Sequence, residues 1–217
     1  MKRSFDILFS FIVILIISPV LLLTIFILKF TGEGEIFYLQ KRVGKNKKTI
    51  YVYKFVTMLK NSPSMGSGIY TAKGDPRILP VGKFLRKSKI NELPQLFNVL
   101  LGHMSIVGPR PLIKETFEFY DNETQEKISQ NRPGITGIGS IVFRDEESIL
   151  QKTEVSNLES YYKNNIAPYK GKLEIWYHEN KSFTLDLQLI LITGWIILFP
   201  KSNLYEKLFS DLPKRSL

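Results

Sequence analysis

The sequence has no cysteine and only two histidines, His103 and His178. Without cysteine the chain can form neither a disulfide nor a thiolate metal site, and two histidines argue against a zinc site of the usual kind. Acidic residues are also scarce, with 20 Asp and Glu against 30 Lys and Arg, so the net charge is +10. This surplus predicts an anionic partner, either nucleic acid, anionic lipid or a phosphorylated substrate. Any metal would be a hard cation held by carboxylates and phosphates, for which Mg²⁺ is the default.

One long hydrophobic run is present, from Ile7 to Leu28, in a chain of 217 residues that has room for one domain and an additional segment. Roughly 22 residues at about 1.5 Å each would cross a bilayer as a straight helix. Ser18 and Pro19 lie at the midpoint of the run, however. A proline there removes a backbone hydrogen bond, and the serine hydroxyl could bond to a carbonyl that is left free.

Basic residues flank this run on both sides, beginning with Lys2 and Arg3 before it and Lys29 after it. By the positive-inside rule, both ends then favour the cytoplasm. We therefore expect residues 1–31 to form a re-entrant membrane helix that bends at Ser18 and Pro19 and returns to the same face. An ordinary transmembrane anchor, a signal peptide and a buried core helix are the alternatives.

Patterning along the rest of the chain predicts a mixture of short elements. Residues 36–40 and 50–55 alternate apolar and polar side chains around a Gly-Lys-Asn turn and predict a β-hairpin. Residues 61–82 are rich in Gly, Pro and Ser and predict a mobile loop over the site. Residues 116–131 predict an amphipathic helix, and residues 132–137 a turn-rich connector.

A second apolar run, residues 185–199, contains Trp195 and is interrupted by Asp186 and Gln188. It is too short to cross a bilayer. It could lie along the membrane interface with the tryptophan at headgroup depth, or it could be a helix packed into the core.

The most informative stretch runs from Asn91 to Pro111. Pro94 is tolerated only in the first turn of a helix, so a helix over 92–101 would begin near Asn91, with Asn91 as its N-cap and Glu92 at the positive end of its dipole. Capping alone explains both residues. The same geometry also suits a phosphate or metal–phosphate site, with Arg86 upstream and Arg110 held between two prolines.

Several motifs, in this order, resemble the signature of the small monotopic phosphoglycosyl transferases, a family of bacterial sugar transferases. They are Lys2-Arg3-Ser4-Phe5-Asp6, Ser18-Pro19, Gln40-Lys41-Arg42-Val43-Gly44, Tyr53-Lys54-Phe55, Gly74-Asp75-Pro76-Arg77, Asn91-Glu92-Leu93-Pro94-Gln95, Gly108-Pro109-Arg110-Pro111, Arg132-Pro133-Gly134-Ile135-Thr136-Gly137 and Ser182-Phe183-Thr184-Leu185-Asp186.

The resemblance implies an α+β, mostly helical fold: a re-entrant membrane helix over 1–31, a small cytoplasmic catalytic domain over 32–183 and interfacial amphipathic helices that include 184–217. It implies a phosphoglycosyl transferase at the cytoplasmic face of the bacterial inner membrane. The family moves a phosphosugar from a UDP-sugar to polyprenol (undecaprenyl) phosphate and releases UMP, with Mg²⁺ as cofactor. Anionic membrane lipid is a further expected partner, and the oligomeric state stays open.

In the family an Asp-Glu pair carries the chemistry: the Asp forms a phosphosugar intermediate, and the Glu binds the metal. Glu92 matches the metal position, whereas Asn91 stands at the nucleophile position, and a carboxamide is a poor nucleophile. The phosphate- and substrate-binding candidates are Arg42, Lys54, Arg86, Arg110 and Arg144.

Three other positions depart from the family pattern: Val56 in place of Arg, His103 in place of Asp, and residues 138–141, which lack the usual Trp and Gln. Together with Asn91 they leave four explanations. Glu92 could be the nucleophile, with metal ligands such as Asp75 or Asp145. The transfer could be direct, Asn91 could be an engineered change, or the chain could be a silent membrane scaffold or lipid-binding partner. Nucleic-acid binding is not expected, because the basic residues form no known reader motif.

Overall fold

The computed structural model describes residues 1–62, 65, 75–146, 149–150 and 158–214. Its α-helices are α1 Lys2–Lys29, α2 Pro80–Lys87, α3 Gln95–Leu100, α4 Lys114–Phe117, α5 Asn122–Ser129, α6 Ile138–Val142, α8 Leu158–Tyr161, α9 Ala167–Asn180, α10 Phe183–Leu198 and α11 Leu204–Leu208. The 3-10 helices are η1 Lys45–Lys47 and η3 Ile90–Glu92, and η4 Tyr162–Ile166 is a π-helix. The strands are β1 Phe37–Val43, β2 Thr49–Phe55, β3 Ser105–Val107 and β4 Gly134–Thr136. The mostly helical α+β composition that was predicted is confirmed.

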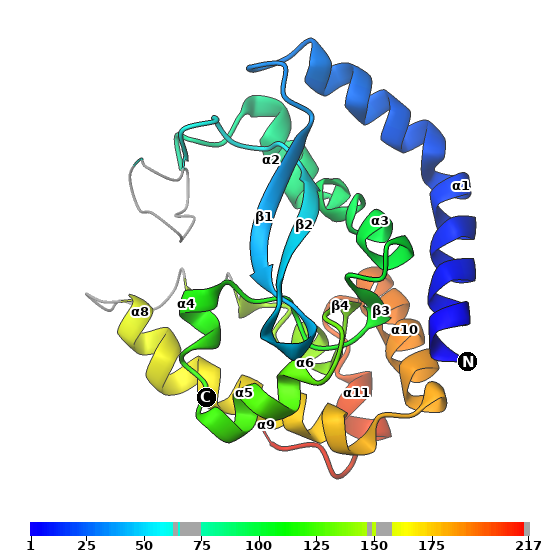
Figure 1. Ribbon diagram of the computed structural model, residues 1–217, viewed down its shortest axis with the longest axis vertical. Coiled ribbons are helices and arrows are strands. Elements are labelled where there is room, and N and C mark those ends of the chain that lie inside the picture. The colour runs from blue at the N-terminus through cyan, green and yellow to red at the C-terminus, as the bar shows by residue number, and fades with distance from the viewer. Residues whose placement is uncertain (63–64, 66–74, 147–148, 151–157, 215–217) are drawn as a thin grey trace.

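The predicted hairpin is present as the antiparallel pair β1 and β2, with Phe37 opposite Phe55 and Val43 opposite Thr49. Its turn places Asn46 and Lys47 in the left-handed region, with φ of 56° and 58°. Figure 1 shows the hairpin in the middle of the molecule, with α2 near one end and the helices α4 to α11 gathered around the other. Val52 and Phe55 of β2 are buried, each in a different hydrophobic cluster, so the hairpin forms a wall of the body rather than a free arm.

Helix α1 continues across Pro19, and Figure 1 shows its axis changing direction in the middle turns. Pro19 has no N–H to donate to the carbonyl of Leu15, four residues earlier. The Ser18 hydroxyl donates to that carbonyl instead, at 2.8 Å, as the sequence predicted. The missing hydrogen bond accounts for the bend.

Among the described residues, α1 is the one helix long and apolar enough to cross a membrane, and most of its apolar side chains are exposed. An exposed apolar surface of this length is costly in water, which supports membrane association.

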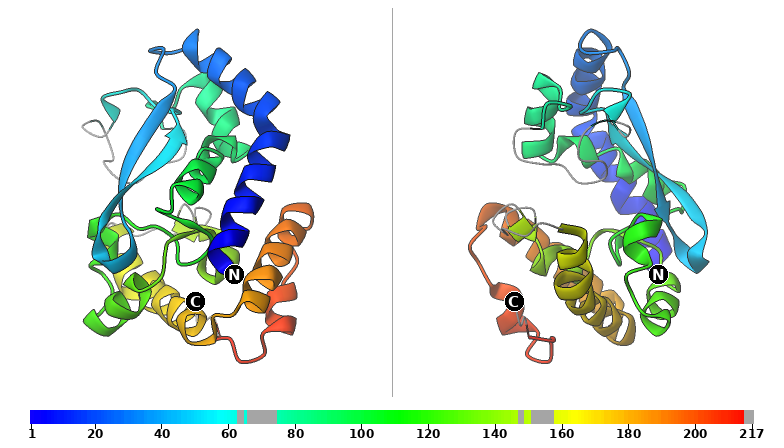
Figure 2. Two further views of the ribbon diagram at one scale, coloured as in Figure 1. Left: turned by 45° about the vertical axis from the view of Figure 1, so that its right-hand side comes forward. Right: turned by 90° about the vertical axis from the view of Figure 1, so that its left-hand side faces the viewer.

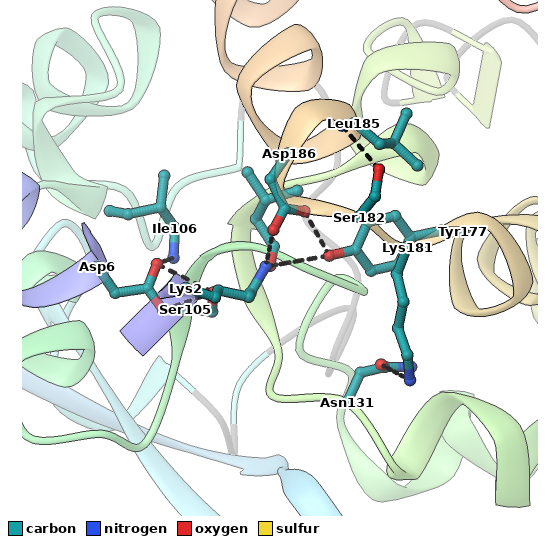
Figure 3. A network of polar contacts seen from close by, with 11 residues as sticks. Lys2, Asp6, Ser105, Ile106, Asn131, Tyr177, Lys181, Ser182, Leu185 and Asp186 are labelled. Carbon is teal, nitrogen blue, oxygen red and sulfur yellow. Dashed lines mark hydrogen bonds and ion pairs between the residues drawn. The ribbon is translucent and has the colours of Figure 1, made fainter. Parts of the chain in front are cut away.

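The N-terminal end of α1 is attached to the body through charged side chains rather than by apolar packing alone. Asp6 is buried and accepts hydrogen bonds from the Ser105 hydroxyl and the Ile106 N–H. Lys2 forms an ion pair with Asp186 of α10 at 2.5 Å (Figure 3).

Arg3 connects α1 to α3. It donates to the carbonyls of Val99 and Leu100 at 2.5 and 2.8 Å, at the C-terminal end of α3. Figures 1 and 2 accordingly show α1 beside α3. These contacts hold α1 in place against β3, α3 and α10.

The core of the body lies between α9, α10, α6 and the short parallel pair β3 and β4. On α10, Leu189 and Ile192 are buried, whereas Leu191 and Ile197 are 73% and 74% exposed. The interpretation of this run as a helix packed into the core is confirmed for one face of α10. The other face presents exposed apolar side chains, and its place at a membrane interface stays a prediction.

Three local predictions need correction. The helix expected over 116–131 is two helices, because Asp121 caps a new one by accepting a hydrogen bond from the Thr124 N–H. The loop expected over 61–82 ends earlier, since α2 already begins at Pro80; residues 63–64 and 66–74 of that prediction lie outside the described residues. The connector over 132–137 contains β4, which pairs with β3.

Candidate functional site

The central block folds as a 3-10 turn, η3, followed by α3. Lys89 adopts a left-handed conformation, with φ of 59°, and the amides of Glu92 and Leu93 then close three-residue turns. The helix proper begins at Gln95, after Pro94. The prediction that Asn91 is the N-cap is wrong: Asn91 lies inside the 3-10 turn, and its buried Oδ1 has no hydrogen-bond partner among the described residues.

A buried side chain, Asn98, fixes α3 against β2. Its Nδ2 donates to the Tyr51 carbonyl at 2.7 Å, and its Oδ1 accepts the Tyr53 N–H at 2.8 Å. This pair of bonds sets the register between α3 and β2 and places the two residues of interest, Glu92 and Lys54, opposite one another. This role of Asn98 was not predicted from the sequence. The signal that could have revealed it is a carboxamide among the apolar residues of the helical pattern over 92–101.

Glu92 is the acidic centre of a basic cluster. The Lys54 ammonium lies 3.0 Å from its Oε1, and a guanidinium nitrogen of Arg110 lies 4.0 Å from the same oxygen. Arg42 approaches from β1 and donates to the carbonyl of Pro111, at 3.2 Å, in the loop that carries Arg110. Four predicted site residues from three separate parts of the chain are thus brought together.

The pKa values show that cations dominate this cluster. Burial would raise the pKa of Glu92, but the charges of Lys54 and Arg110 outweigh it and hold the pKa at about 2. Burial lowers the pKa of Lys54 to about 8, with Glu92 opposing the change and the two arginines adding to it. Burial and the neighbouring Arg110 also lower the pKa of Arg42, to about 10. One carboxylate cannot neutralise three cations, so the cluster retains positive charge for an anionic ligand.

The cluster lines a cavity of about 1570 Å³. Its walls hold Arg42, Lys54, Arg86, Asn91, Glu92 and Arg110, together with lysines such as Lys83, Lys87, Lys89 and Lys114. The volume exceeds the 300 to 1,000 Å³ typical of small-molecule sites. It therefore has room for a large polyanionic substrate and a second reactant.

Two of the predicted phosphate-binding residues have different surroundings. Arg86, on α2, reaches the cavity wall, where its Nη1 lies 3.8 Å from the Met58 sulfur. Arg144 is not brought to the cluster: its guanidinium donates to the carbonyls of Pro200 and Ser202, at 3.0 and 3.1 Å, and lies over the ring of Tyr205. In this position Arg144 anchors the segment that follows α10.

The departures from the family pattern differ in position. Val56 lines the cavity, whereas His103 is exposed at the turn after α3. Asp75, considered as an alternative metal ligand, forms a buried ion pair with Arg77 at 2.6 Å. Pairing of this kind leaves its carboxylate oriented toward the arginine rather than toward a metal.

The residues around Glu92 fit a magnesium ion only in part. The described residues contain no group of three or more His, Asp or Glu side chains able to hold a metal ion. Mg²⁺ is commonly held by one or two carboxylates together with substrate phosphates and water. Glu92 supplies one carboxylate for an ion of that kind.

Comparison with known proteins shows which family this sequence belongs to. The family described as bacterial sugar transferase matches residues 1–200. The chain belongs to the bacterial sugar transferase family. The predicted recognition is confirmed, and with it the phosphoglycosyl transferase class.

Three curated relatives illustrate the range of this family. The exopolysaccharide production protein ExoY of Sinorhizobium fredii is 37% identical over 161 residues, covering 68% of this chain and 71% of that protein. A UDP-N-acetylgalactosamine-undecaprenyl-phosphate N-acetylgalactosaminephosphotransferase of Aeromonas hydrophila is 41% identical, covering 65% of this chain and 34% of that protein. An undecaprenyl-phosphate galactose phosphotransferase of Salmonella typhimurium is 35% identical, covering 91% and 40%. The last two relatives are thus considerably longer than this chain.

Proposed function

We propose that this chain transfers a phosphosugar from a UDP-sugar to undecaprenyl phosphate and releases UMP. The observation that carries the proposal is the ionised Glu92 beside Lys54 and Arg110, in a cavity that retains positive charge. In the reaction, the bond from the β-phosphorus to the oxygen bridging the two phosphates breaks. The electron pair leaves with UMP, and the phosphorus becomes bonded to an oxygen of the lipid phosphate.

The basic residues suit this substrate because they are positioned before it binds. Lys54, Arg42 and Arg110 would hold the two phosphates and offset the charge that develops on the leaving UMP. Arg110 is 44% exposed at its side chain, so its guanidinium can turn from Glu92 to a phosphate without breaking a buried contact. Arg86 borders the same cavity and would bind the second phosphorylated reactant.

Mg²⁺ is the proposed cofactor, and Glu92 would hold it. When bound, it would neutralise charge on the diphosphate. Glu92 is ready for this role at neutral pH because its pKa is about 2 and its carboxylate carries no proton. The protein donors are few, so we expect magnesium to bind together with the nucleotide.

Asn91 is the position at which the proposal departs from the family's covalent route. Its side chain is buried beside Glu92 and has no anionic oxygen. Either Glu92 acts as the nucleophile and other groups hold the metal, or Glu92 holds the metal and the lipid phosphate attacks directly with both substrates bound. The cations serve both routes in the same way, so the overall reaction does not depend on the choice.

We further propose that α1 is re-entrant, enters the inner membrane from the cytoplasmic face and returns to it. The bend at Pro19 and the basic residues at both ends support this course. The exposed apolar side chains of α10 would lie in the same interface, with anionic lipid against the neighbouring lysines. This arrangement would keep the cavity close to a lipid-borne substrate.

The direct test is release of UMP by the purified chain in nanodiscs, with a panel of UDP-sugars, undecaprenyl phosphate and Mg²⁺. We expect turnover that requires all three, and a loss of at least about 10²-fold in Glu92→Ala. Glu123→Ala is the matched control, because Glu123 is an exposed residue paired with Lys127, and neither residue lines the cavity.

Asn91→Asp separates the remaining possibilities. Turnover by the unmodified chain means that Asn91 belongs to a working site. Silence that only Asn91→Asp relieves would mean that the site is intact but inactive. Silence of every variant with every sugar would leave the alternative function, a membrane scaffold or lipid-binding partner.

A further inference from the structure

A second cavity lies at the N-terminal end of α1, where that helix meets β3 and α10. Its volume is about 510 Å³, and it shares no lining residue with the larger cavity around Glu92. Its wall is built from α1, β3, the segment before β4 and the junction of α9 with α10. A cavity of this size can hold a small molecule or the polar headgroup of a lipid. The proposed transfer reaction makes no use of it.

This second cavity carries more positive than negative charge. Four basic side chains line it together with two carboxylates: Lys2, Arg3, Arg132 and Lys181 against Asp6 and Asp186. One of the carboxylates is already occupied, because Lys2 forms an ion pair with Asp186 (Figure 3). The other three cations form no ion pair with any carboxylate of the described residues. The surplus charge therefore favours an anionic ligand.

Arg132 is held through one side of its guanidinium only. Its Nε donates to the carbonyl of Gly102 at 2.9 Å, whereas its two Nη nitrogens have no hydrogen-bond partner among the described residues. Arg3 lies next to the same glycine, since a Cβ at Gly102 would lie 3.3 Å from the Arg3 Nη2. Lys181 is exposed and donates to the Asn131 carboxamide oxygen at 3.2 Å (Figure 3). A planar pair of N–H donors with two further cations in the same wall suits a phosphate group.

Apolar side chains continue from one edge of this cavity along two helices. Phe183 lines the cavity and meets Phe5 of α1 edge-on, with ring centroids 5.3 Å apart. Leu187 and Leu191 follow Phe183 at intervals of four residues, so the three exposed side chains share one face of α10. Leu8, which is 62% exposed, follows Phe5 by three residues on α1. A charged recess thus borders an exposed apolar surface.

We infer that this cavity binds the headgroup phosphate of an anionic phospholipid, with Arg132 and Lys181 on the phosphate and Phe183 beside the acyl chains. Arg3 contributes through its charge, because its Nη nitrogens already donate to carbonyls at the end of α3. A soluble phosphate would use the cations but has no apolar part to cover the neighbouring face of α10. The inference rests on the proposed membrane location of α1 and does not rest on the transfer reaction.

The test must separate a defined site from the diffuse attraction between a chain of net charge +10 and anionic lipid. We would use native mass spectrometry of the full chain in an uncharged detergent, titrated with phosphatidylglycerol or with phosphatidylcholine. The cavity variant combines Arg132→Gln with Lys181→Gln. The matched control combines Lys45→Gln with Lys48→Gln, which removes the same charge from two exposed residues that line neither cavity.

We expect the unmodified chain to retain phosphatidylglycerol in preference to phosphatidylcholine. The affinity for phosphatidylglycerol should fall about 20-fold in the cavity variant, because each basic residue near an anionic headgroup accounts for about a fivefold change. The control variant should keep the affinity of the unmodified chain. Lys181→Gln alone changes only an exposed side chain, and it should show about a fivefold loss even if Arg132→Gln lowers stability. Equal losses in the cavity and control variants would overturn the inference.

Glycerol 3-phosphate distinguishes a lipid site from a site for a soluble phosphate, because it carries the headgroup phosphate without acyl chains. We expect it to leave phosphatidylglycerol bound even at a large molar excess. Displacement of the lipid by glycerol 3-phosphate would overturn the assignment to a phospholipid. Absence of UMP release, with lipid retention as expected, would count against the proposed function alone and leave this inference standing.

Discussion

At the scale of single residues, the electrostatics of Lys54 decide how the cavity holds an anion. Its ammonium lies 3.0 Å from Glu92, yet burial and two arginines lower its pKa to about 8. The residue is therefore charged at neutral pH and loses its proton just above it. A phosphate ligand binds the charged form better and would raise this pKa.

The first prediction follows from that value. Below about pH 8 the ammonium is present, and affinity for UDP with Mg²⁺ should be at its maximum; as the pH rises through about 8, the free protein loses this charge and affinity should fall. Titration calorimetry from about pH 7 to about pH 9.5 measures it. Lys54→Arg should move the decline to higher pH, since arginine stays protonated. An identical pH dependence in both proteins would show that another group titrates.

The sequence predicted most of the basic site residues correctly, but not all of them. The cations Arg42, Lys54 and Arg110 were predicted from the resemblance, and the structure brings them together around Glu92. Arg144 was predicted on the same grounds but anchors the C-terminal segment. The difference is one of tertiary placement, which the local pattern around residue 144 does not contain.

At the scale of elements, α3 and β2 are joined by a polar contact inside an apolar interface. Asn98 is fully buried and satisfies one carbonyl and one N–H of β2. Because this contact sets the separation of Glu92 and Lys54, it links the fold directly to the site.

The second prediction concerns Asn98→Ala. Removal of the carboxamide leaves the Tyr51 carbonyl and the Tyr53 N–H without their partner, at a cost of about 1–3 kcal/mol for each buried group. We expect the free energy of unfolding to fall by about 2–4 kcal/mol, with a matching drop in thermal midpoint. Asn164→Ala is the control, because Asn164 is exposed and its carboxamide bonds only within its own helical segment, to the Ser160 hydroxyl. Equal stability of the two variants would mean that Asn98 does not hold α3 on β2.

Hydrophobic periodicity predicted the elements that repeat a simple pattern, such as the hairpin and α10. It failed where one residue changes the local geometry. Asp121 splits one expected helix into two, and Lys89, in a left-handed conformation, turns the start of another into a 3-10 turn. Such breaks depend on cap hydrogen bonds and single dihedral angles, which periodicity does not detect.

At the scale of the whole molecule, helix α1 and the site are connected through polar contacts. Arg3 contacts the end of α3, whose other end follows Glu92, and Lys2 contacts the Val107 carbonyl of the strand that leads to Arg110. Figure 3 shows Lys2 between Ser105 of β3 and Asp186 of α10. These contacts connect α1 to α3 and β3, the two elements that neighbour the site residues.

The third prediction concerns the course of α1. The chain has no native cysteine, so single cysteines introduced by Ser4→Cys and Lys45→Cys report unambiguously. Both positions are exposed. For a re-entrant helix, an impermeant maleimide should label both in inside-out vesicles and neither in intact spheroplasts. Labelling of Ser4→Cys from the periplasm, with Lys45→Cys labelled from the cytoplasm, would show that α1 crosses the membrane.

The central claim is that the Glu92 cluster moves a phosphosugar onto a lipid phosphate. Mass spectrometry of the lipid fraction tests it most directly, after the chain in nanodiscs is incubated with undecaprenyl phosphate, Mg²⁺ and each UDP-sugar in turn. We expect undecaprenyl phosphate to gain the mass of one sugar phosphate with one or more donors, in proportion to the UMP formed, and no gain with Glu92→Ala. UMP formed without any change in the lipid would contradict the account, because the site would then transfer the phosphosugar to water.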